Sequence, residues 1–303
     1  MAKRYPRAIL VSCEVPWDED EKLMEDAFRQ EIRKTLVNYN HLYIFGTAGE
    51  GYAVTLGQFK EIAEIFGEET DRPDVHPMVG AIGMSTGQVV ERVGAAYDIG
   101  FRVFQIPLLP WGALTDNEYM TYFKDVCGSF PDASFLHYNL ERPKRMLYTE
   151  DYRRLEAEVP NLVGTKFTGA SPEEAYKLVT QTELQHFLGE RNFPFGCLHG
   201  ECSLLASWGP LFPRKIRELF DHGVEGRFEK LFRLSAEITR VTEAFMGPAR
   251  GLERIDGAFD KMVVRASGAD MPLRLLSPYE GIDLETFEAC VKALRDSYPG
   301  WLQ

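Results

Sequence analysis

The stretch LVGTKFTGASPEEAYKLVTQ, residues 162–181, holds one complete β/α unit. Its first seven residues are mostly apolar or β-branched, which is typical of a short buried strand. Ser171 then stands as a candidate N-cap, and Pro172 takes the first helical position, where its missing N–H costs nothing. The segment that follows has the pattern of a helix. The stretch therefore predicts a strand that ends near Lys166 and leads directly into a helix.

The same order of strand and helix recurs through most of the chain. Eight segments have the composition of short strands, and most precede a helical pattern: residues 8–15, 41–47, 76–83, 101–109, 133–140, 162–168, 184–190 and 202–207. Strict alternation over about 200 residues predicts a parallel sheet with helical crossovers. Eight units favour an α/β protein with a closed (β/α)8 barrel, a TIM barrel, over an open doubly wound sheet.

The pattern changes after residue 213, where helical segments follow one another without strands between them. Three such segments stand out: residues 214–223, 227–245 and 283–298. We therefore expect a (β/α)8 barrel catalytic domain over residues 1–213. A C-terminal helical region over residues 214–303 is expected to pack on the barrel or to help build an oligomer.

Composition narrows the classes of protein to which the chain can belong. Lys and Arg number 34 against 46 Asp and Glu, and the formal charge of −12 argues against nucleic acid and anionic membranes as partners. Five scattered cysteines do not suggest a disulfide framework. The first apolar run is too short for a signal peptide, and no stretch is suited to crossing a membrane. We expect a cytoplasmic protein that acts on a small molecule.

In a β/α barrel, the residues that carry out chemistry lie at the carboxyl ends of the strands. Lys166 is the sharpest candidate there, because Val163 and Phe167 predict a weakly solvated pocket that disfavours the charged amine. A neutral amine can attack a ketone and form a Schiff base, an electron sink for breaking or making a neighbouring bond. The alternative is a barrel lysine that is paired with a carboxylate or reaches solvent.

Two further features lie on the same predicted rim. Tyr138 ends the preceding strand, where a phenol can relay a proton during imine formation, although a packed aromatic residue is the simpler interpretation. The turn GTAGE, residues 46–50, exposes backbone N–H groups and the Thr47 hydroxyl, a combination suited to holding a carboxylate. No Gly-Lys-Ser/Thr follows this turn, so it is not a P-loop.

The segment CLHGEC, residues 197–202, offers a rival site. Four of its residues are possible zinc ligands: Cys197, His199, Glu201 and Cys202. No second cluster with metal-like spacing accompanies them, and the remaining histidines are dispersed. Two interpretations stay open, a zinc-dependent lyase and a pair of buried thiols beside a loop, of which the second is simpler.

Taken together, the motifs resemble the dihydrodipicolinate synthase/N-acetylneuraminate lyase family. The resemblance rests on GTAGE after the second strand, on Tyr138 with Asn139 after the fifth, and on GTK ending at Lys166, 28 residues after Tyr138. VPWDEDEKL also looks like the family's opening after the first strand. The resemblance implies a class I lyase that forms a Schiff base with pyruvate or a 2-keto-3-deoxy acid. It also implies that no cofactor is needed and that the chain forms a homotetramer, a dimer of dimers.

The resemblance implies roles for individual residues. Lys166 would form the imine and Tyr138 would relay protons, while Thr47 and the Ala48 backbone N–H would hold the carboxylate of the keto acid. Three further positions match residues that line the substrate end of the site in the lyase branch: Thr168, Gly189 and Ser203.

Several positions depart from the family's pattern. Ala48 replaces a threonine, which preserves a backbone contact and removes a hydroxyl contact. Leu108 and Leu109 stand where the synthase branch has a tyrosine pair, one of which reaches into the proton relay of the neighbouring subunit. Pro143 stands where that branch has an arginine that holds the carboxylate of the second substrate, with Arg142 and Arg145 out of register.

The pocket beyond the imine also differs, because Glu190-Arg191-Asn192 follows Gly189 where the sialic acid lyase has a pair of acids.

Our leading hypothesis is an aldolase or dehydratase that uses a lysine imine. The sequence does not choose between cleavage, condensation and loss of water. A non-catalytic family member that binds a small ligand or regulates another protein is the alternative, followed by the zinc-dependent lyase.

Overall fold

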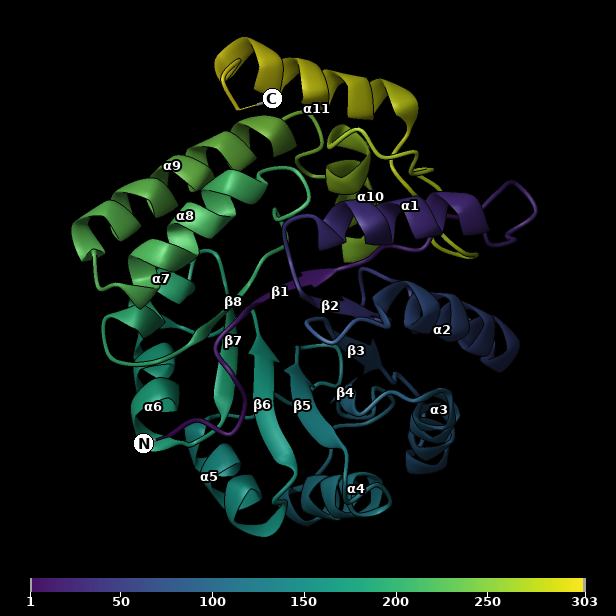
Figure 1. The fold of residues 1–303 in the computed structure, drawn as a ribbon, viewed down its shortest axis with the longest axis vertical. Helices are drawn as coiled ribbons and strands as arrows, with labels where there is room; N and C mark the ends of the chain where they lie inside the picture. Colours follow the sequence, from purple (N-terminus) through teal and green to yellow (C-terminus); the bar gives the residue numbers. More distant parts are fainter. Residues whose placement is uncertain (1, 302–303) are drawn as a thin grey trace.

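Eight parallel strands close into one barrel in chain order, with β8 pairing back to β1. The computed structural model describes residues 2–301, and Figure 1 shows the helices arranged around these strands. The strands are β1 (Ile9–Ser12), β2 (His41–Ile44), β3 (His76–Gly80), β4 (Val103–Ile106), β5 (Ser134–Asn139), β6 (Leu162–Phe167), β7 (Gln185–Gly189) and β8 (Ser203–Leu205). Each lies within one of the eight predicted segments, so the TIM barrel is confirmed.

One helix follows each strand. These helices are α1 (Glu25–Leu36), α2 (Leu56–Thr70), α3 (Thr86–Ile99), α4 (Asp116–Gly128), α5 (Thr149–Glu158), α6 (Pro172–Gln181), α7 (Phe193–Cys197) and α8 (Pro213–Val224). The expected cap of α6 is present, because the Ser171 hydroxyl accepts a hydrogen bond from Glu174 N at 3.1 Å. At the start of α4, Thr115 forms a capping box with Glu118. Such caps satisfy N–H groups that have no partner within the helix, which fixes where each helix begins.

Three more helices follow: α9 (Phe228–Met246), α10 (Asp256–Ala266) and α11 (Leu284–Ser297). They share an apolar core of their own with residues of the β8–α8 loop, and Figure 1 shows them gathered along one side of the barrel. The sequence analysis missed α10, whose apolar pattern is interrupted by Asp260 and Lys261. The division at residue 213 stays a prediction, and residues 1, 302 and 303 lie outside the described chain.

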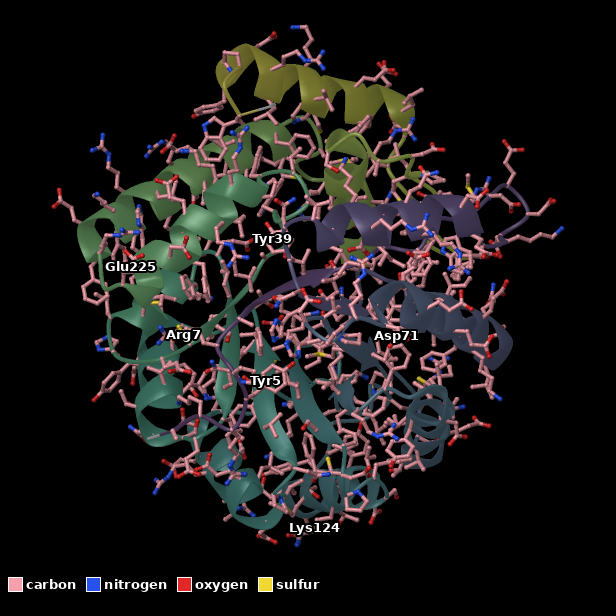
Figure 2. The ribbon with its side chains drawn as sticks, viewed as in Figure 1. Tyr5, Arg7, Tyr39, Asp71, Lys124 and Glu225 are labelled. Atoms are coloured by element: carbon pink, nitrogen blue, oxygen red, sulfur yellow. The ribbon has the colours of Figure 1, made fainter. Side chains whose placement is uncertain are left out.

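The inside of the barrel is filled by side chains rather than open as a pore. A cluster of buried, mostly apolar side chains fills the interior: Tyr5 (labelled in Figure 2), Ala8, Leu10, Tyr43, Met78, Leu136, Val163, Phe187 and Leu205. Such layers of inward-facing side chains are the usual core of this barrel. Because this cluster fills the interior, a small molecule can reach the barrel's side chains only at an end of the barrel.

None of the helices in the described part of the chain is long and apolar enough to span a membrane.

Candidate active site

The turn after β2 brings the GTAGE segment across the end of the barrel. β2 ends at Ile44 because Phe45 adopts a positive φ of 59°, a backbone conformation that residues other than glycine rarely take. The turn is tight, since a Cβ on Gly51 would lie 2.5 Å from the Phe45 carbonyl oxygen. Strained backbone of this kind, costing about 1–3 kcal/mol, is common at functional sites. Its result here is that Thr47 and Ala48 face the barrel mouth.

Lys166 and Tyr138 are held side by side by the register of the sheet. β5 pairs with β6 so that Tyr138 lies opposite Lys166. The Lys166 side chain is 3% exposed, and its Nζ donates a hydrogen bond to Tyr43 Oη at 2.9 Å. Nζ also lies 3.8 Å from the Tyr138 ring centroid and 4.1 Å from that of Tyr43. The amine is therefore enclosed by two phenol rings, and no carboxylate contacts it among the described residues.

Thr47 completes this group from the opposite side of the mouth. Its Oγ1 lies 3.0 Å from Tyr138 Oη, within hydrogen-bond distance. Gly46, just before it, would place a Cβ 3.1 Å from Lys166 Nζ, so the glycine leaves the space beside the amine open. Among the described residues, no backbone hydrogen bond uses the N–H of Thr47 or Ala48. The predicted trio of Lys166, Tyr138 and Thr47 therefore converges on one point.

Burial sets the protonation of the amine. It lowers the pKa of Lys166 from its usual 10.5 to about 7, against the opposing attraction of the carboxylates of Asp260, Glu14 and Asp256. About half of the amine is then neutral near pH 7. Burial raises the pKa of Tyr138 to about 12, with the Thr47 hydrogen bond acting in the other direction. The pair consists of a nucleophile that can be neutral and a phenol that keeps its proton.

Two neighbouring cavities lie beyond this group. One, of about 220 Å³, is lined by the predicted residues Thr168 and Gly189, together with Glu190, Arg191, Asn192, Ser207, Trp208, Ile238, Thr239 and Thr242. The other, of about 180 Å³, shares Ser207 and Trp208 and is bounded by Asp256 and Asp260 of α10. Most side chains that line the first cavity are polar. The second cavity is bordered by the carboxyl groups of Asp256 and Asp260, which also attract the Lys166 ammonium.

Ser203 is not brought to this group. It begins β8, at the end of the barrel away from the mouth, where its hydroxyl accepts a hydrogen bond from Ala8 N at 2.9 Å. Ser207, four residues later, lines both cavities instead. Ser203 was assigned to the site through the family resemblance, and the run 202–207 does not by itself show which of its residues reaches the mouth of the barrel.

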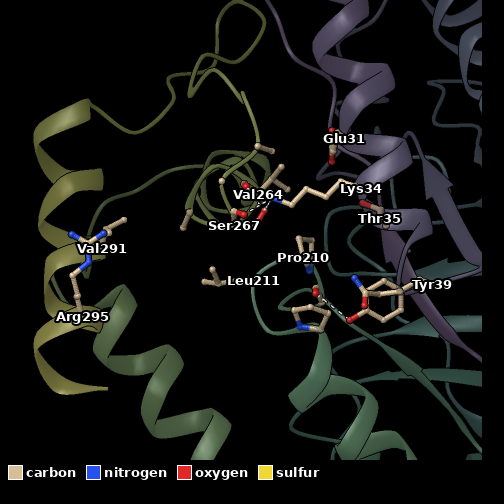
Figure 3. A pocket seen from close by; sticks show the side chains of 16 residues that line it. Glu31, Lys34, Thr35, Tyr39, Pro210, Leu211, Val264, Ser267, Val291 and Arg295 are labelled. Carbon is tan, nitrogen blue, oxygen red and sulfur yellow. Dashed lines mark hydrogen bonds between the residues drawn. The ribbon is translucent and has the colours of Figure 1, made fainter. Parts of the chain in front are cut away.

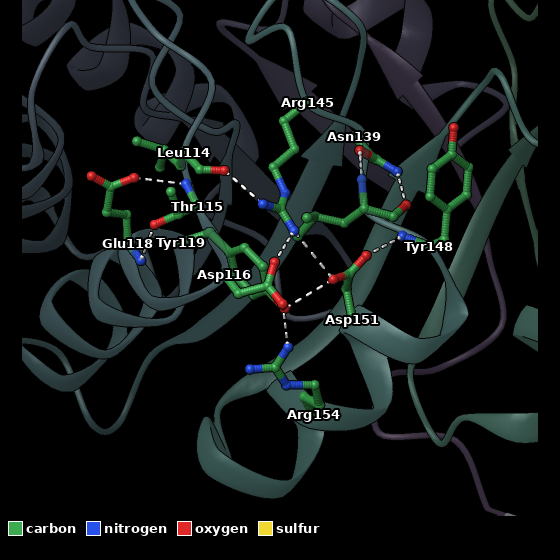
Figure 4. Close-up of polar contacts among 11 residues, drawn as sticks. Leu114, Thr115, Asp116, Glu118, Tyr119, Asn139, Arg145, Tyr148, Asp151 and Arg154 are labelled. Carbon is green, nitrogen blue, oxygen red and sulfur yellow. Dashed lines mark hydrogen bonds and ion pairs between the residues drawn. The ribbon is translucent and has the colours of Figure 1, made fainter.

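The two arginines near β5 each pair with an acidic side chain. Arg142 forms a two-pronged ion pair with Asp256 of α10, with both N···O distances at 3.2 Å. Arg145 donates to the Leu114 carbonyl at 2.7 Å and to Asp116 at 2.5 Å, in the network of Figure 4 that joins the first turns of α4 and α5. Pro143 offers no charged side chain. The Arg142 guanidinium, however, is close enough to Tyr138 to act against the rise in the pKa of that phenol.

The residues of the rival zinc site point in different directions. Cys197 and Cys202 lie with their Sγ atoms 3.7 Å apart. His199 packs against the ring of Tyr176, and Glu201 pairs with Arg7 at 3.8 Å. No three potential metal ligands of the described chain converge at any point. This arrangement fits two buried thiols beside a loop.

Comparison with known proteins places the chain in a family. The sequence profile of the dihydrodipicolinate synthetase family matches residues 5–287. The chain belongs to this family. Membership confirms the predicted class, a Schiff-base (class I) lyase of the dihydrodipicolinate synthase/N-acetylneuraminate lyase type. No curated protein sequence matches the chain.

Solved structures of the family share the fold over nearly the whole chain. Dihydrodipicolinate synthase from Thermotoga maritima is 19% identical, with a TM-score of 0.84 over 98% of this chain and 100% of that one. CdNal from Clostridium difficile, solved with mannosamine, is 16% identical, with a TM-score of 0.85 over 97% and 100%. YagE from E. coli K12, solved with pyruvate, is 15% identical, with a TM-score of 0.85 over 95% and 98%. At these identities the likeness is one of fold.

The sequence analysis missed several polar residues around the amine of this family member. Tyr43 contacts Lys166 directly, while Ser12 and Glu14 project from β1 and its end toward the same space. Asp256 and Asp260 reach the mouth from α10. A signal for the first group does exist, because Ser12 and Glu14 are two residues apart and so share the inward face of an otherwise apolar strand. Nothing in the sequence indicated that α10 covers the mouth.

Proposed function

We propose that this chain makes or breaks a bond beside the keto group of pyruvate or a 2-keto-3-deoxy acid, through an imine on Lys166. The observation that carries the proposal is the setting of the amine, which is fully buried, hydrogen-bonded to a phenol and next to no contacting carboxylate. A buried lysine in an ion pair would stay charged and unreactive. This one is held near half protonation at neutral pH.

In the proposed reaction, the Nζ lone pair of Lys166 attacks the C2 carbonyl carbon of the keto acid. Tyr138 gives its phenolic proton to the carbonyl oxygen and is reprotonated through the Thr47 hydroxyl or the substrate. The oxygen leaves as water and the C2=N⁺ imine remains. The enamine then forms in one of two ways: Tyr138 takes a proton from C3, or it takes the proton of the C4 hydroxyl while the C3–C4 bond breaks and an aldehyde is released. In both cases the iminium accepts the electron pair of the broken bond, and Tyr138 regains its proton.

The GTAGE turn supplies the proposed carboxylate contact. Thr47 offers a hydroxyl, and Thr47 and Ala48 offer backbone N–H groups without other backbone partners in the described chain. Successive N–H groups in a turn form a concave site that suits an anion. Ala48 presents only its backbone there, so one hydroxyl contact seen in the family's usual motif is replaced by a methyl group.

The cavities support a hydroxylated partner for the keto acid. The side chains of Thr168, Asn192 and Thr239 line the cavity of about 220 Å³ and can exchange hydrogen bonds with sugar-like hydroxyl groups. Arg191 lies on the same wall, although it is paired with Glu243 at 3.4 Å. We therefore favour a 2-keto-3-deoxy sugar acid over a small apolar aldehyde.

We also propose that the protein acts in the cytoplasm as a homotetramer, a dimer of dimers. All five cysteines are free thiols, which suits a reducing compartment. On the adjacent loops after β3 and β4, Met84 and Trp111 are 50% and 81% exposed, which suits coverage by another subunit. Light scattering after gel filtration tests the assembly, with a single species of four chains as the expected result and a monomer as the contrary one.

The reaction is tested without knowledge of the second substrate by proton exchange in deuterated water. If an enamine forms, the methyl protons of pyruvate exchange with solvent, and NMR follows their loss. Wild-type protein is expected to exchange them well above background, whereas Lys166→Ala is expected to show only background exchange. Release of pyruvate from a panel of 2-keto-3-deoxy sugar acids then identifies the substrate. Absence of exchange with the wild-type protein would contradict the proposal.

A further inference from the structure

Two buried residues beside the amine have no part in the reaction proposed above. Tyr43 projects into the barrel from β2 and accepts the hydrogen bond of Lys166 Nζ at 2.9 Å. Glu14 follows β1, is 1% exposed, and has one carboxylate oxygen, Oε2, without a hydrogen-bond partner. An unpaired buried carboxylate oxygen is costly to retain, so its position beside a reacting amine calls for a function.

The Ser12 hydroxyl connects these two residues. Ser12 lies opposite Tyr43 in the register of β1 with β2, and it shares the inward face of β1 with Glu14 two residues further on. From this position its hydroxyl acts against the rise in pKa that burial causes at both Glu14 and Tyr43. The order of groups is therefore Lys166 amine, Tyr43 phenol, Ser12 hydroxyl and Glu14 carboxylate. The hydroxyl groups of Tyr43 and Ser12 can each accept one proton while donating another, and the Glu14 carboxylate can accept the proton at the end of the chain.

The tyrosine pair that follows the fourth strand in the synthase branch, one of which takes part in a proton relay, is replaced here by two leucines. Leu108 is buried at 1% exposure, and Leu109 packs against the same apolar core. Neither side chain can carry a proton. The polar groups of Tyr43, Ser12 and Glu14 therefore offer an alternative route for proton transfer, and this route lies entirely within one subunit.

We propose that Tyr43, Ser12 and Glu14 form an internal proton relay for Lys166, in which Tyr43 contacts the reacting nitrogen and Glu14 stores the proton. The proposal rests on the imine chemistry of the proposed function. It assigns a catalytic role to Tyr43 and a proton-storing role to Glu14, and it needs no residue from a neighbouring subunit.

The proton balance of the relay closes. When the ammonium of Lys166 is to become a nucleophile, it gives a proton to Tyr43 Oη, while the phenolic proton of Tyr43 moves through Ser12 to the Glu14 carboxylate. The neutral amine then attacks the ketone. The stored proton returns along the same groups when the carbinolamine oxygen leaves as water. The sum is an ammonium and a ketone on one side and an iminium and water on the other, with no net gain or loss of protons.

The charges around Glu14 suit proton storage. Burial raises its pKa to about 7, against the Ser12 hydrogen bond and the attraction of Lys261 and Lys166. Burial acts in the opposite direction on Lys166, whose pKa it lowers to about 7, so burial brings the proton affinities of the two groups toward each other.

Other charged groups face the same space from every side. From α1, Glu31 accepts a hydrogen bond from Glu14 N at 2.7 Å, and it also lines a separate cavity of about 320 Å³ between α1, α10 and α11 (Figure 3). From α10, Asp256 and Asp260 attract the Lys166 ammonium, and Lys261 attracts the Glu14 carboxylate. Glu50, on the GTAGE turn, opposes the ionisation of Glu14.

A purely structural role, as a counter-charge to Lys261, is the competing explanation for Glu14. Lys261 already contacts Glu50 at 2.6 Å and donates to the Arg274 carbonyl at 2.5 Å. Glu14 makes no ion pair with Lys261 among the described residues, so it is not needed to complete that lysine's contacts. The two explanations predict opposite effects of removing the Glu14 charge on imine formation.

Two measurements on the variants Glu14→Gln and Tyr43→Phe distinguish the proton relay from the counter-charge role. Competitive acetylation with acetic anhydride, read by peptide mass spectrometry, gives the pH at which the Lys166 amine becomes neutral. Borohydride trapping with pyruvate in single turnover gives the rate of imine formation. Tyr5→Phe is the matched control for the buried tyrosine, since the Tyr5 ring packs against His41 and Phe187. Glu69→Gln is the control for a buried carboxylate, since Glu69 of α2 is 8% exposed and pairs with Arg33 of α1 at 2.6 Å. Thermal unfolding of every variant shows whether it folds, and Ser12→Ala provides a second, milder test of the relay.

The relay predicts opposite changes in Glu14→Gln. Without the carboxylate, the acetylation midpoint of Lys166 should move to lower pH, yet trapping should slow by about 10²-fold because the proton has no store. Tyr43→Phe should slow trapping to a similar extent, Ser12→Ala to a lesser one, and both controls should stay within a factor of two of wild type. A counter-charge role predicts instead that Glu14→Gln traps pyruvate faster below pH 7, and this result would overturn the relay.

Failure of the imine chemistry gives a different result. If wild-type protein does not trap pyruvate, the proposed function falls and the relay falls with it. The acetylation midpoints still decide whether Glu14 and Lys166 are electrostatically coupled. Normal trapping in the wild type, with unchanged rates in Tyr43→Phe and Glu14→Gln, overturns the relay and leaves the proposed function intact.

Discussion

Two buried lysines in this molecule lie in opposite kinds of environment. Lys261, on α10, is 0% exposed and contacts the equally buried Glu50 at 2.6 Å, and Glu50 also accepts hydrogen bonds from Trp17 Nε1 at 2.9 Å and Leu276 N at 2.7 Å. Lys166, on β6, is 3% exposed but contacts phenols, with the carboxylates of Glu14 and Asp260 beyond direct contact. Burial lowers the pKa of both lysines.

The difference lies in the partner rather than in the burial. In the Lys261–Glu50 pair, each charge compensates the desolvation of the other, and the pair joins α10 to the GTAGE turn. In the Lys166 site, the neighbouring groups are the uncharged phenols of Tyr43 and Tyr138, which can contact the lysine nitrogen whether or not it carries a charge. The first lysine therefore holds the site together, and the second is available for chemistry.

The largest effect expected from this contrast is loss of activity in Lys166→Ala. Removing the nucleophile should lower turnover on the identified substrate by at least about 10⁴-fold, because the remaining groups cannot form the imine. Lys177→Ala, which removes an exposed lysine paired with Glu173, serves as the control and should keep wild-type turnover. Substantial residual turnover in Lys166→Ala would mean that another group forms the covalent intermediate.

Lys261→Met should act on stability instead. Breaking a buried ion pair leaves Glu50 charged and unpaired, and we expect the free energy of unfolding to fall by about 3–5 kcal/mol. Denaturant titration measures this change. The double variant Glu50→Gln/Lys261→Met should recover part of the loss, because it removes both charges. Equal stability of Lys261→Met and wild type would contradict the structural role of this pair.

Tyr138→Phe is expected to lower turnover by about 10²–10³-fold while leaving the fold intact, because it removes the proton of a phenol that contacts Thr47 and borders the amine. The measurement is kcat/KM with the pH profile of trapping. A drop confined to KM, with kcat unchanged, would assign Tyr138 to substrate binding rather than proton transfer.

Lys166→Met provides the smallest and most specific test, a change in the pH dependence of stability. Because the pKa of Lys166 falls from 10.5 to about 7 on folding, the unfolded chain binds a proton that the folded chain lacks between these values. Wild-type stability should therefore rise with pH across this window, by up to about 1.4 kcal/mol per pH unit. The methionine variant lacks this titration, so its stability relative to wild type should be greatest below pH 7 and decline above it. A constant difference between pH 6.5 and 9 would contradict the lowered pKa.

Much of the fold was predictable because its signals are local. Each strand reads as a short apolar run, and caps such as Ser171 mark where helices begin. Lys166, Tyr138 and Thr47 were predictable for the same reason, since each stands at the end of such a run. Ser203 was misplaced because the run at 202–207 does not by itself show which of its residues reaches the mouth of the barrel.

The surroundings of the amine were not predictable from local signals. The contact of Tyr43 with Lys166 spans 123 residues and depends on the closure of the barrel. Asp256 and Asp260 reach the mouth only because α10 docks on the GTAGE turn, where a Cβ on Gly257 would lie 3.0 Å from the Ala48 carbonyl oxygen. Such long-range packing decides which carboxylates face the lysine and at what distance, and therefore decides its reactivity.

The most direct test of the contrast between the two lysines is borohydride reduction in the presence of pyruvate, followed by peptide mass spectrometry of the whole chain. We expect a single pyruvate-derived adduct on the peptide that contains Lys166 and none on the peptide that contains Lys261. A chain without an adduct, or one modified at Lys261 as readily as at Lys166, would contradict the assignment of reactivity to the phenol-lined amine.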